Sequence, residues 1–229
     1  MHLTVVGSGT ATPEADRVCS GYFIDDGATR ILMDCGPGVV HRLARFGLPW
    51  PDLDHVAITH FHNDHLGDLP MLLFALKWGL PEPRAEPLTI WGPAGLASRM
   101  WRLASAIGDH VLDPGFPLRI LELTEGDSVR LRDDLELRAA RTPHTPESLA
   151  FRVDGPAGGI GYTGDTGPSS DVARFLAGCD LLVAECSLPD DEAIPTHLSP
   201  STLAATAADV LRARQDPCSQ INASDCDTS

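Results

Sequence analysis

The sequence predicts a mixed α/β fold, because two kinds of hydrophobic segment alternate along it. Short segments rich in valine, isoleucine and leucine have the length of β-strands, and longer segments carry apolar residues every three or four positions, as amphipathic helices do. Glycine and proline separate the segments, for example at 36–38 and 92–93, where they allow backbone bends. With 229 residues and 43% hydrophobic content, the chain can bury a sizeable core, and we expect one domain over 1–214.

The elements follow from this periodicity in chain order. We expect strands at 2–7, 20–26, 29–35, 55–60, 88–92, 118–123, 127–131, 135–141, 148–154, 158–163 and 180–186. We expect helices between them, at 38–46, 66–78, 94–107, 169–178 and 199–213. Ser199 and Pro200 suit the start of the last helix, as N-cap and first helical residue. The pattern by itself predicts several antiparallel strand pairs and no finer topology.

The charge balance argues against broad nucleic-acid binding. The chain has 17 Lys plus Arg against 32 Asp plus Glu, a net charge of −15, and Lys77 is its one lysine. Nucleic-acid-binding proteins normally present a basic face, because neutralising phosphates supplies most of the sequence-independent affinity. No apolar run approaches the ~20 residues that span a bilayer, and no secretion signal opens the chain. We therefore expect a cytoplasmic protein outside the membrane, with its cysteines reduced.

The most informative motif is THFHNDHLGD at 59–68, which places three histidines and an aspartate within six positions. Imidazole nitrogen and carboxylate oxygen suit zinc and similar ions, and the run has no cysteine of the kind that holds structural zinc. Alternate residues leaving a strand point to one side, so His60 and His62 should bind one ion while Phe61 turns into the core. Asp64 and His65, where a helix starts, should reach a second ion. The alternative is a solvated loop with Asp64 as a helix N-cap.

Two further ligand candidates follow expected strands. His144 lies between two prolines at a strand end, and a histidine stiffened in this way suits a third ligand. Catalytic zinc commonly takes three protein ligands, so His60, His62 and His144 should complete the first site. Asp165 follows a glycine turn, which projects its carboxylate from the sheet edge. The alternatives are a turn histidine bonded to the backbone and an aspartate that caps the next helix.

These motifs, taken in order, resemble the metallo-β-lactamase superfamily. HxHxDH after a short apolar strand occupies 60–65, and five further segments are similar to the ribonuclease Z branch, namely 3–13, 20–24, 31–36, 143–145 and 162–166. The similarity covers about residues 2–212, and the ordered set is far more specific than HxHxDH alone. The resemblance implies a four-layer αβ/βα sandwich of the metallo-β-lactamase type.

The resemblance also implies a dinuclear zinc centre, with manganese as a possible replacement. It implies that Asp165 bridges the two ions and that Asp64 and His65 hold the second. Glu185 ends an apolar strand, where its buried charge requires a partner, and His197 lies in an HLS segment. The resemblance implies that these two residues relay a proton to the leaving oxygen. We expect Asp64 to orient the attacking hydroxide or to deprotonate the water that forms it. The expected catalytic residues are Asp64, Glu185 and His197.

The chain departs from this family after the last expected helix. Relatives continue with a strand whose end carries a histidine for the second metal, whereas residues 215–229 are polar and contain no histidine. We therefore expect a truncated or altered terminus, a disordered tail over 215–229, and a second metal site that is short of one ligand.

Three functions compete at this point. The first is a zinc-dependent phosphodiesterase of the ribonuclease Z kind, acting on a small phosphodiester or a transfer-RNA 3′ trailer. The segments between the matched motifs are short and acidic, without the basic arm that docks RNA in relatives. The second is a sulfatase or lactonase acting on small molecules, and the third is a non-catalytic metal-binding protein. We predict the first, as a homodimer, with the second and third as alternatives.

Overall fold

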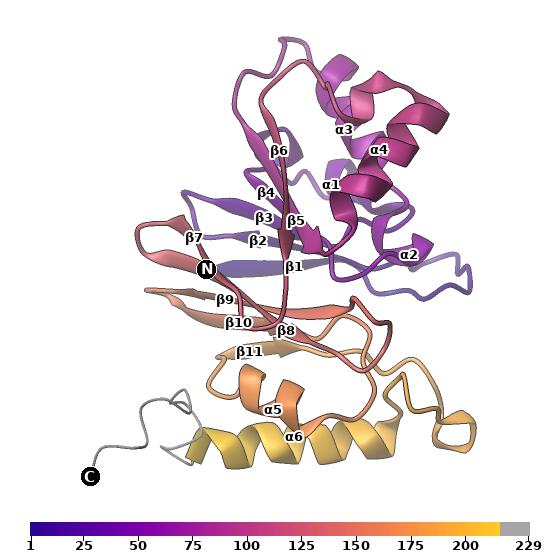
Figure 1. Cartoon of the computed structure of the whole chain (residues 1–229), viewed down its shortest axis with the longest axis vertical. Coiled ribbons are helices and arrows are strands. Elements are labelled where there is room, and N and C mark those ends of the chain that lie inside the picture. The colour runs from indigo at the N-terminus through magenta and orange to yellow at the C-terminus, as the bar shows by residue number, and fades with distance from the viewer. Residues whose placement is uncertain (216–229) are drawn as a thin grey trace. The chain divides into compact units, whose positions relative to one another are not determined.

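The structure, a computed structural model, describes residues 1–215. The chain divides into two compact units, Met1–Leu123 and Thr124–Ser229, each built around one β-sheet (Figure 1). Of the tail predicted at 215–229, Gln215 is the last residue of a helix, and residues 216–229 lie outside the described residues. The prediction of one domain over 1–214 stays a prediction.

The first unit contains a six-stranded mixed sheet. Its strands lie side by side in chain order: β1 His2–Gly7, β2 Gly21–Asp25, β3 Arg30–Met33, β4 His55–Ala57, β5 Leu88–Pro93 and β6 Leu118–Leu123. The first three pair antiparallel, and β3 to β6 pair parallel. Parallel neighbours need crossover connections, and helices supply them here.

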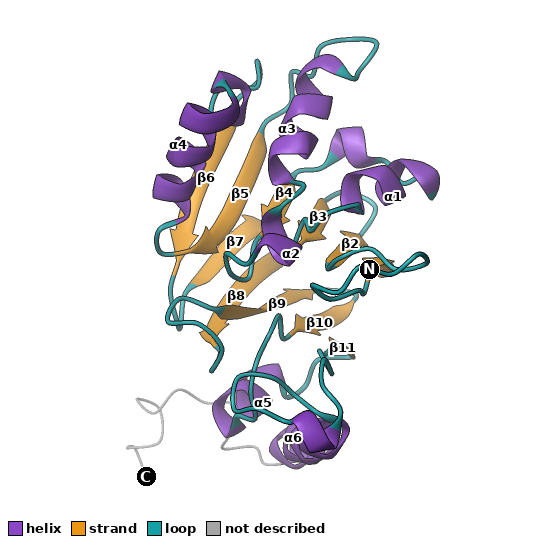
Figure 2. Ribbon diagram, turned by 90° about the vertical axis from the view of Figure 1, so that its right-hand side faces the viewer, coloured by secondary structure: helices purple, strands orange, loops and turns teal. Residues whose placement is uncertain are grey.

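The helices of this unit lie on one face of the sheet (Figure 2). They are α1 Val39–Arg45, α2 Asn63–Leu66, α3 Leu69–Trp78 and α4 Leu96–Ile107, with short 3-10 turns at Trp50–Asp52 and Asp109–Val111. Leu69, Leu72, Leu73 and Leu76 repeat at helical spacing on α3 and are fully buried in the same core cluster as Ile90 of β5. The core therefore lies between the sheet and this layer of helices.

The helix predicted at 66–78 begins three residues later in the structure, because α3 starts at Leu69, while Leu66 is the last residue of the short helix α2. The Asp68 carboxylate does not bond the helix that follows it. It accepts the N–H groups of Gly38, at 2.8 Å, and Val40, at 3.1 Å, and so caps α1. Burial raises the pKa of Asp68, although these N–H groups oppose the shift.

The second unit contains a five-stranded sheet in the order β11-β10-β9-β8-β7. The strands are β7 Ser128–Arg132, β8 Leu135–Arg141, β9 Leu149–Gly155, β10 Gly158–Tyr162 and β11 Leu181–Val183. All neighbours pair antiparallel except β10 and β11. Two helices, α5 Ser170–Leu176 and α6 Pro200–Gln215, lie on one face of this sheet, and a 3-10 turn occupies Asp190–Glu192.

The structure confirms the predicted α/β class and the predicted antiparallel pairs. Most expected strands and helices begin and end within two residues of the observed ones. Strand 55–60 is shorter, because β4 ends at Ala57 and leaves His60 on the following loop. Among residues 1–215, no helix has both the length and the apolar content to cross a bilayer. The four cysteines of this range, Cys19, Cys35, Cys179 and Cys186, form no disulfide with one another.

Candidate metal centre and active site

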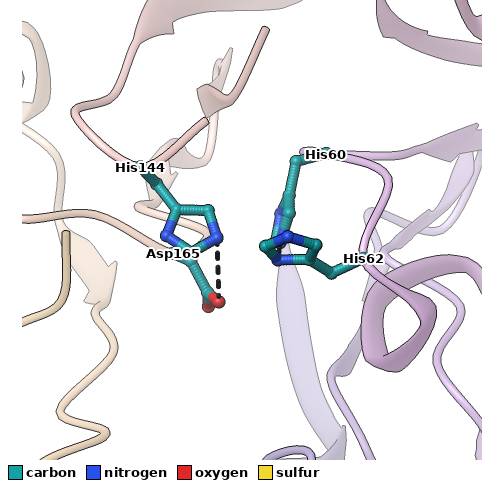
Figure 3. Close-up of side chains that lie close together, drawn as sticks. All are labelled: His60, His62, His144 and Asp165. Carbon is teal, nitrogen blue, oxygen red and sulfur yellow. Dashed lines mark hydrogen bonds and ion pairs between the residues drawn. The ribbon is translucent and has the colours of Figure 1, made fainter. Parts of the chain in front are cut away.

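The loop after β4 carries the first pair of ligand candidates (Figure 3). His60 Nε2 lies 3.1 Å from His62 Nδ1, with the two rings edge to face. Two nitrogens bound to one tetrahedral zinc ion at about 2.05 Å lie about 3.3 Å apart, so the pair fits a common ion. Phe61, between them in sequence, is half-buried and packs against the core of the first unit, as the alternation predicted.

The orientation of His60 is set by a chain of buried hydrogen bonds. The hydroxyl of Thr59 donates to the Asp34 carboxylate at 2.9 Å, which leaves the Thr59 oxygen to accept from His60 Nδ1 at 3.1 Å. All three side chains are fully buried. With its proton on Nδ1, His60 presents the lone pair of Nε2, which is the atom that faces His62.

His65 is held by the same carboxylate. Its Nδ1 lies 2.7 Å from Asp34 Oδ2, and its Nε2 lies 3.7 Å from Asp64 Oδ2. Nδ1 therefore carries the proton, and the Nε2 lone pair and the Asp64 carboxylate lie on the same side of the ring. Asp34 was not assigned a role from the sequence. The signal that could have found it is a carboxylate at the end of the apolar strand 30–33, where a buried charge requires partners.

The second unit carries the other two ligand candidates on the loops after β8 and β10. His144 Nδ1 lies 3.1 Å from the backbone oxygen of Thr196. Its Nε2 lies 3.7 Å from Asp165 Oδ2 (Figure 3). The backbone bond that we named as an alternative role for His144 is thus present. Because it uses Nδ1, it leaves Nε2 with its lone pair, as a metal ligand requires. Thr196 was missed, since a backbone carbonyl has no sequence signature.

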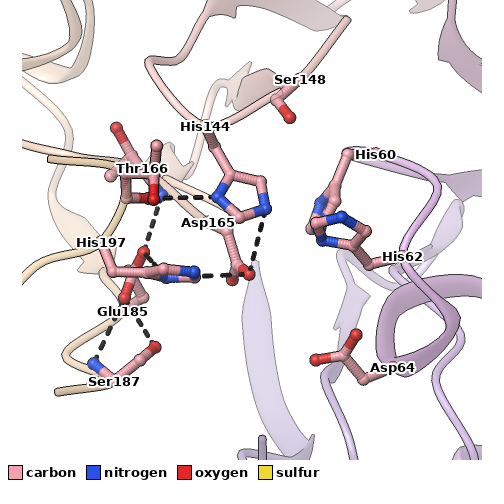
Figure 4. A network of polar contacts seen from close by, with 12 residues as sticks. His60, His62, Asp64, His144, Ser148, Asp165, Thr166, Glu185, Ser187 and His197 are labelled. Carbon is pink, nitrogen blue, oxygen red and sulfur yellow. Dashed lines mark hydrogen bonds and ion pairs between the residues drawn. The ribbon is translucent and has the colours of Figure 1, made fainter. Parts of the chain in front are cut away.

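Glu185 and His197 form a hydrogen-bonded pair beside Asp165 (Figure 4). Glu185 Oε1 lies 2.9 Å from His197 Nδ1 and also accepts the N–H of Thr166 at 2.7 Å. Its Oε2 accepts the Ser187 hydroxyl at 2.6 Å. The buried Glu185 carboxylate therefore has several partners, and the structure brings together the two residues for which a proton relay was predicted.

The predicted site residues thus fall into two clusters, one in each unit. The first-unit cluster is His60, His62, Asp64 and His65, supported by Asp34 and Thr59. The second-unit cluster is His144, Asp165, Glu185 and His197. Each cluster presents imidazole nitrogen and carboxylate oxygen without a thiolate, which is the donor chemistry of a catalytic rather than a structural zinc site.

Comparisons with known proteins give the family. A protein-family model described as a beta-lactamase superfamily domain matches residues 29–216. Ribonuclease Z of Haloarcula marismortui is 28% identical over 262 residues, covering 93% of this chain and 82% of that protein. Ribonuclease Z of Mycobacterium bovis is 30% identical over 194 residues, covering 80% and 69%. The crystal structure of the short form of human tRNase Z matches with a TM-score of 0.76 at 25% identity, covering 91% and 88%.

These matches confirm the predicted fold class, α/β of the metallo-β-lactamase type. They also confirm the predicted enzyme class, a metal-dependent hydrolase of the phosphodiesterase kind. The family model covers most of the chain, and the relatives named above are ribonuclease Z proteins. The chain therefore belongs to the metallo-β-lactamase superfamily, in its ribonuclease Z-like branch.

Proposed function

We propose that the two clusters together hold a dinuclear zinc centre that serves phosphodiester hydrolysis. In this proposal the ligands of one ion are His60, His62 and His144, and those of the other are Asp64 and His65, with Asp165 shared. One observation carries it: Nδ1 of His60, His65 and His144 faces an oxygen, which leaves Nε2 of each ring as a ligand atom. The order of the motifs along the chain and the family support joining the clusters.

The donor set favours zinc, with manganese as the runner-up. Imidazole-rich sites prefer zinc, whereas manganese prefers sites dominated by oxygen, and the proposed first ion has three imidazoles. When bound, two such ions would supply an activated water nucleophile and would neutralise charge on the phosphate. The side chains of the described residues would supply the remaining chemistry, which is to take a proton from the attacking water and to give one to the leaving oxygen.

Asp64 and the Glu185–His197 pair are the proposed proton-handling groups. The Asp64 side chain is 20% exposed, so it can reach both its neighbour His65 and a water molecule that it orients or deprotonates. Glu185 engages His197 Nδ1, so Nε2 is the atom that can protonate the leaving oxygen. Hydrogen bonds from Thr166 and Ser187 fix the Glu185 carboxylate, and this carboxylate then orients the His197 ring.

We propose that the substrate is a phosphodiester of a small molecule or of a transfer-RNA 3′ trailer. The names of the relatives, ribonuclease Z and tRNase Z, support the RNA substrate. The net charge of −15 supports a small substrate, since an extended RNA would meet an acidic surface. The homodimer stays a prediction, which sedimentation velocity tests.

A substrate panel tests this function. The zinc-loaded chain should hydrolyse bis(p-nitrophenyl) phosphate, and chelation should abolish that activity. A precursor transfer RNA in the same panel decides between the two phosphodiester classes. Faster turnover of p-nitrophenyl sulfate or of a lactone than of either phosphodiester would contradict the proposal. Activity that survives complete metal removal would contradict it too.

A further inference from the structure

A cavity of about 360 Å³ adjoins the ligand loop within the first unit. Its lining includes Phe61 of that loop, Leu66 and Pro70 of α2 and α3, and Arg99, Arg102 and Leu103 of α4. None of these six residues has a part in the centre described above. The cavity falls in the lower part of the ~300–1,000 Å³ range typical of small-molecule sites.

One wall of the cavity is an arginine stacked on an aromatic ring. The guanidinium carbon of Arg99 lies 3.9 Å from the centre of the Phe61 ring, which is a cation–π contact. Gly95 borders this stack, since a Cβ there would lie 3.4 Å from Arg99 Nη1 and 3.8 Å from Phe61, which are ordinary contact distances. Gly95 also has a φ of +97°, which favours glycine. The wall is therefore flat, partly apolar and cationic.

A second arginine adds charge to the same cavity. Arg102 follows Arg99 by three residues on α4, so both side chains project from one face of the helix. Arg102 is exposed, and no residue in the described range 1–215 forms an ion pair or hydrogen bond with its side chain. The carboxylate of Glu122, a residue of β6, accepts the N–H of Ala97 at the start of α4, and Glu122 does not line the cavity. Two arginines thus give the cavity a positive lining, although the chain has a net charge of −15.

We propose that this cavity binds one nucleotide of the substrate, with its base against the Phe61–Arg99 stack and its phosphate on Arg102. Bases stack on aromatic rings and on guanidinium planes, and phosphate pairs with arginine, so a nucleotide is the ligand class that uses both features. Phe61 lies between His60 and His62 in sequence, so the cavity borders the loop that holds the first ligands. The inference rests on the proposed function, since it adds a nucleotide subsite to a phosphodiesterase.

The test is the binding of adenosine 5′-monophosphate to the full chain in excess chelator, measured by calorimetry. We expect saturable binding, weaker binding of adenosine and of inorganic phosphate, and a loss of about fivefold in Arg102→Ala, whose side chain is exposed. Arg99 is half-buried, so Arg99→Ala should lower the affinity for adenosine 5′-monophosphate further, by about tenfold. The loss in Arg99→Lys should be smaller than in Arg99→Ala, because lysine keeps the charge and loses the planar stack. The control Arg45→Ala, an exposed arginine of α1 outside the cavity, should bind as the unchanged chain does.

Absence of binding, or an equal loss in Arg45→Ala, would overturn the subsite. Unchanged affinity in Arg102→Ala and Arg99→Ala would overturn it as well. If Arg99→Ala does not fold, as circular dichroism would report, the exposed Arg102 variant still decides. Because chelator removes the metal from this assay, a negative result leaves hydrolysis of bis(p-nitrophenyl) phosphate untouched, and the two proposals fail separately.

Discussion

Replacing Asp34 by asparagine should weaken metal binding without reshaping the first unit. Asp34 is fully buried, and its carboxylate accepts the Thr59 N–H on Oδ1 at 2.8 Å and His65 Nδ1 on Oδ2 at 2.7 Å. Its φ of +56° lies in the left-handed region, which asparagine tolerates as well as aspartate. The substitution therefore preserves shape and backbone and changes only charge and hydrogen bonding.

An amide cannot accept on both sides. If the asparagine oxygen faces the Thr59 N–H, its NH₂ group faces His65, and His65 must accept on Nδ1 and move its proton to Nε2. With the proton on Nε2, that nitrogen has no free lone pair and cannot bind the metal, because the changed hydrogen-bond partner has selected the other histidine tautomer. Loss of such a supporting carboxylate costs about 10- to 100-fold in metal affinity, which is about 1.4 to 2.7 kcal/mol.

The assay is a zinc titration against a competing chelator, with the unfolding free energy measured on the metal-free chain. Asp54→Asn is the matched control, because Asp54 also accepts a backbone N–H, that of Arg30 at 2.8 Å, and has no contact with a ligand histidine. We expect zinc affinity to fall in Asp34→Asn and to stay unchanged in Asp54→Asn. The loss should be largest at the site that His65 serves, because His65 bonds Asp34 directly whereas His60 bonds it through Thr59. Unchanged affinity for both equivalents would refute the tautomer argument.

Three further predictions follow from single contacts. Glu185→Gln and His197→Ala should retain zinc but lose about 10²- to 10⁴-fold in kcat on a substrate with a poor leaving group, because the pair protonates the leaving oxygen. The loss should be smaller on p-nitrophenyl esters, whose leaving group needs no proton. Equal losses on both substrates would contradict that role. Burial raises the pKa of the Cys179 thiol to about 11, so at pH 8 about one thiol in a thousand is ionised. Peptide-resolved alkylation should therefore modify the exposed Cys186 far sooner than Cys179. Faster modification of Cys179 would contradict this prediction. Asp68→Ala should lower the unfolding free energy in urea by about 1 to 2 kcal/mol, because α1 loses its cap, and an unchanged midpoint and slope would show that the cap contributes nothing.

The ligand loop could be predicted from the sequence because its geometry is local. His60 and His62 alternate as a strand ends, and His65 follows one helical turn later, so short-range rules bring these rings together. The same rules give Phe61 its place against the core. Element boundaries were also accessible, since periodicity and turn residues are local signals.

The supporting groups could not be predicted, because tertiary pairing places them. Asp34 meets Thr59 through the parallel pairing of β3 with β4, in which Met33 is opposite Ala57. The sequence does not state which strands are neighbours, so a contact across 25 positions has no local signature. The role of Asp68 has no local signature either, since it caps a helix that precedes it by about 30 positions.

The central claim, that His62 of the first unit and His144 of the second bind the same ion, is tested most directly by counting zinc in a double-mutant cycle. Because we expect the second site to bind zinc more weakly than the first, zinc is counted at a concentration that saturates both sites. We then expect two equivalents per chain in the unchanged protein and one in each of His62→Ala and His144→Ala, since an open three-ligand site does not spare a ligand. The double variant should also hold one, because both substitutions remove the same ion. His41→Ala, an exposed histidine of α1, is the control and should hold two. A double variant that holds no zinc while each single variant holds one would show that the two histidines serve different ions, and would contradict the account.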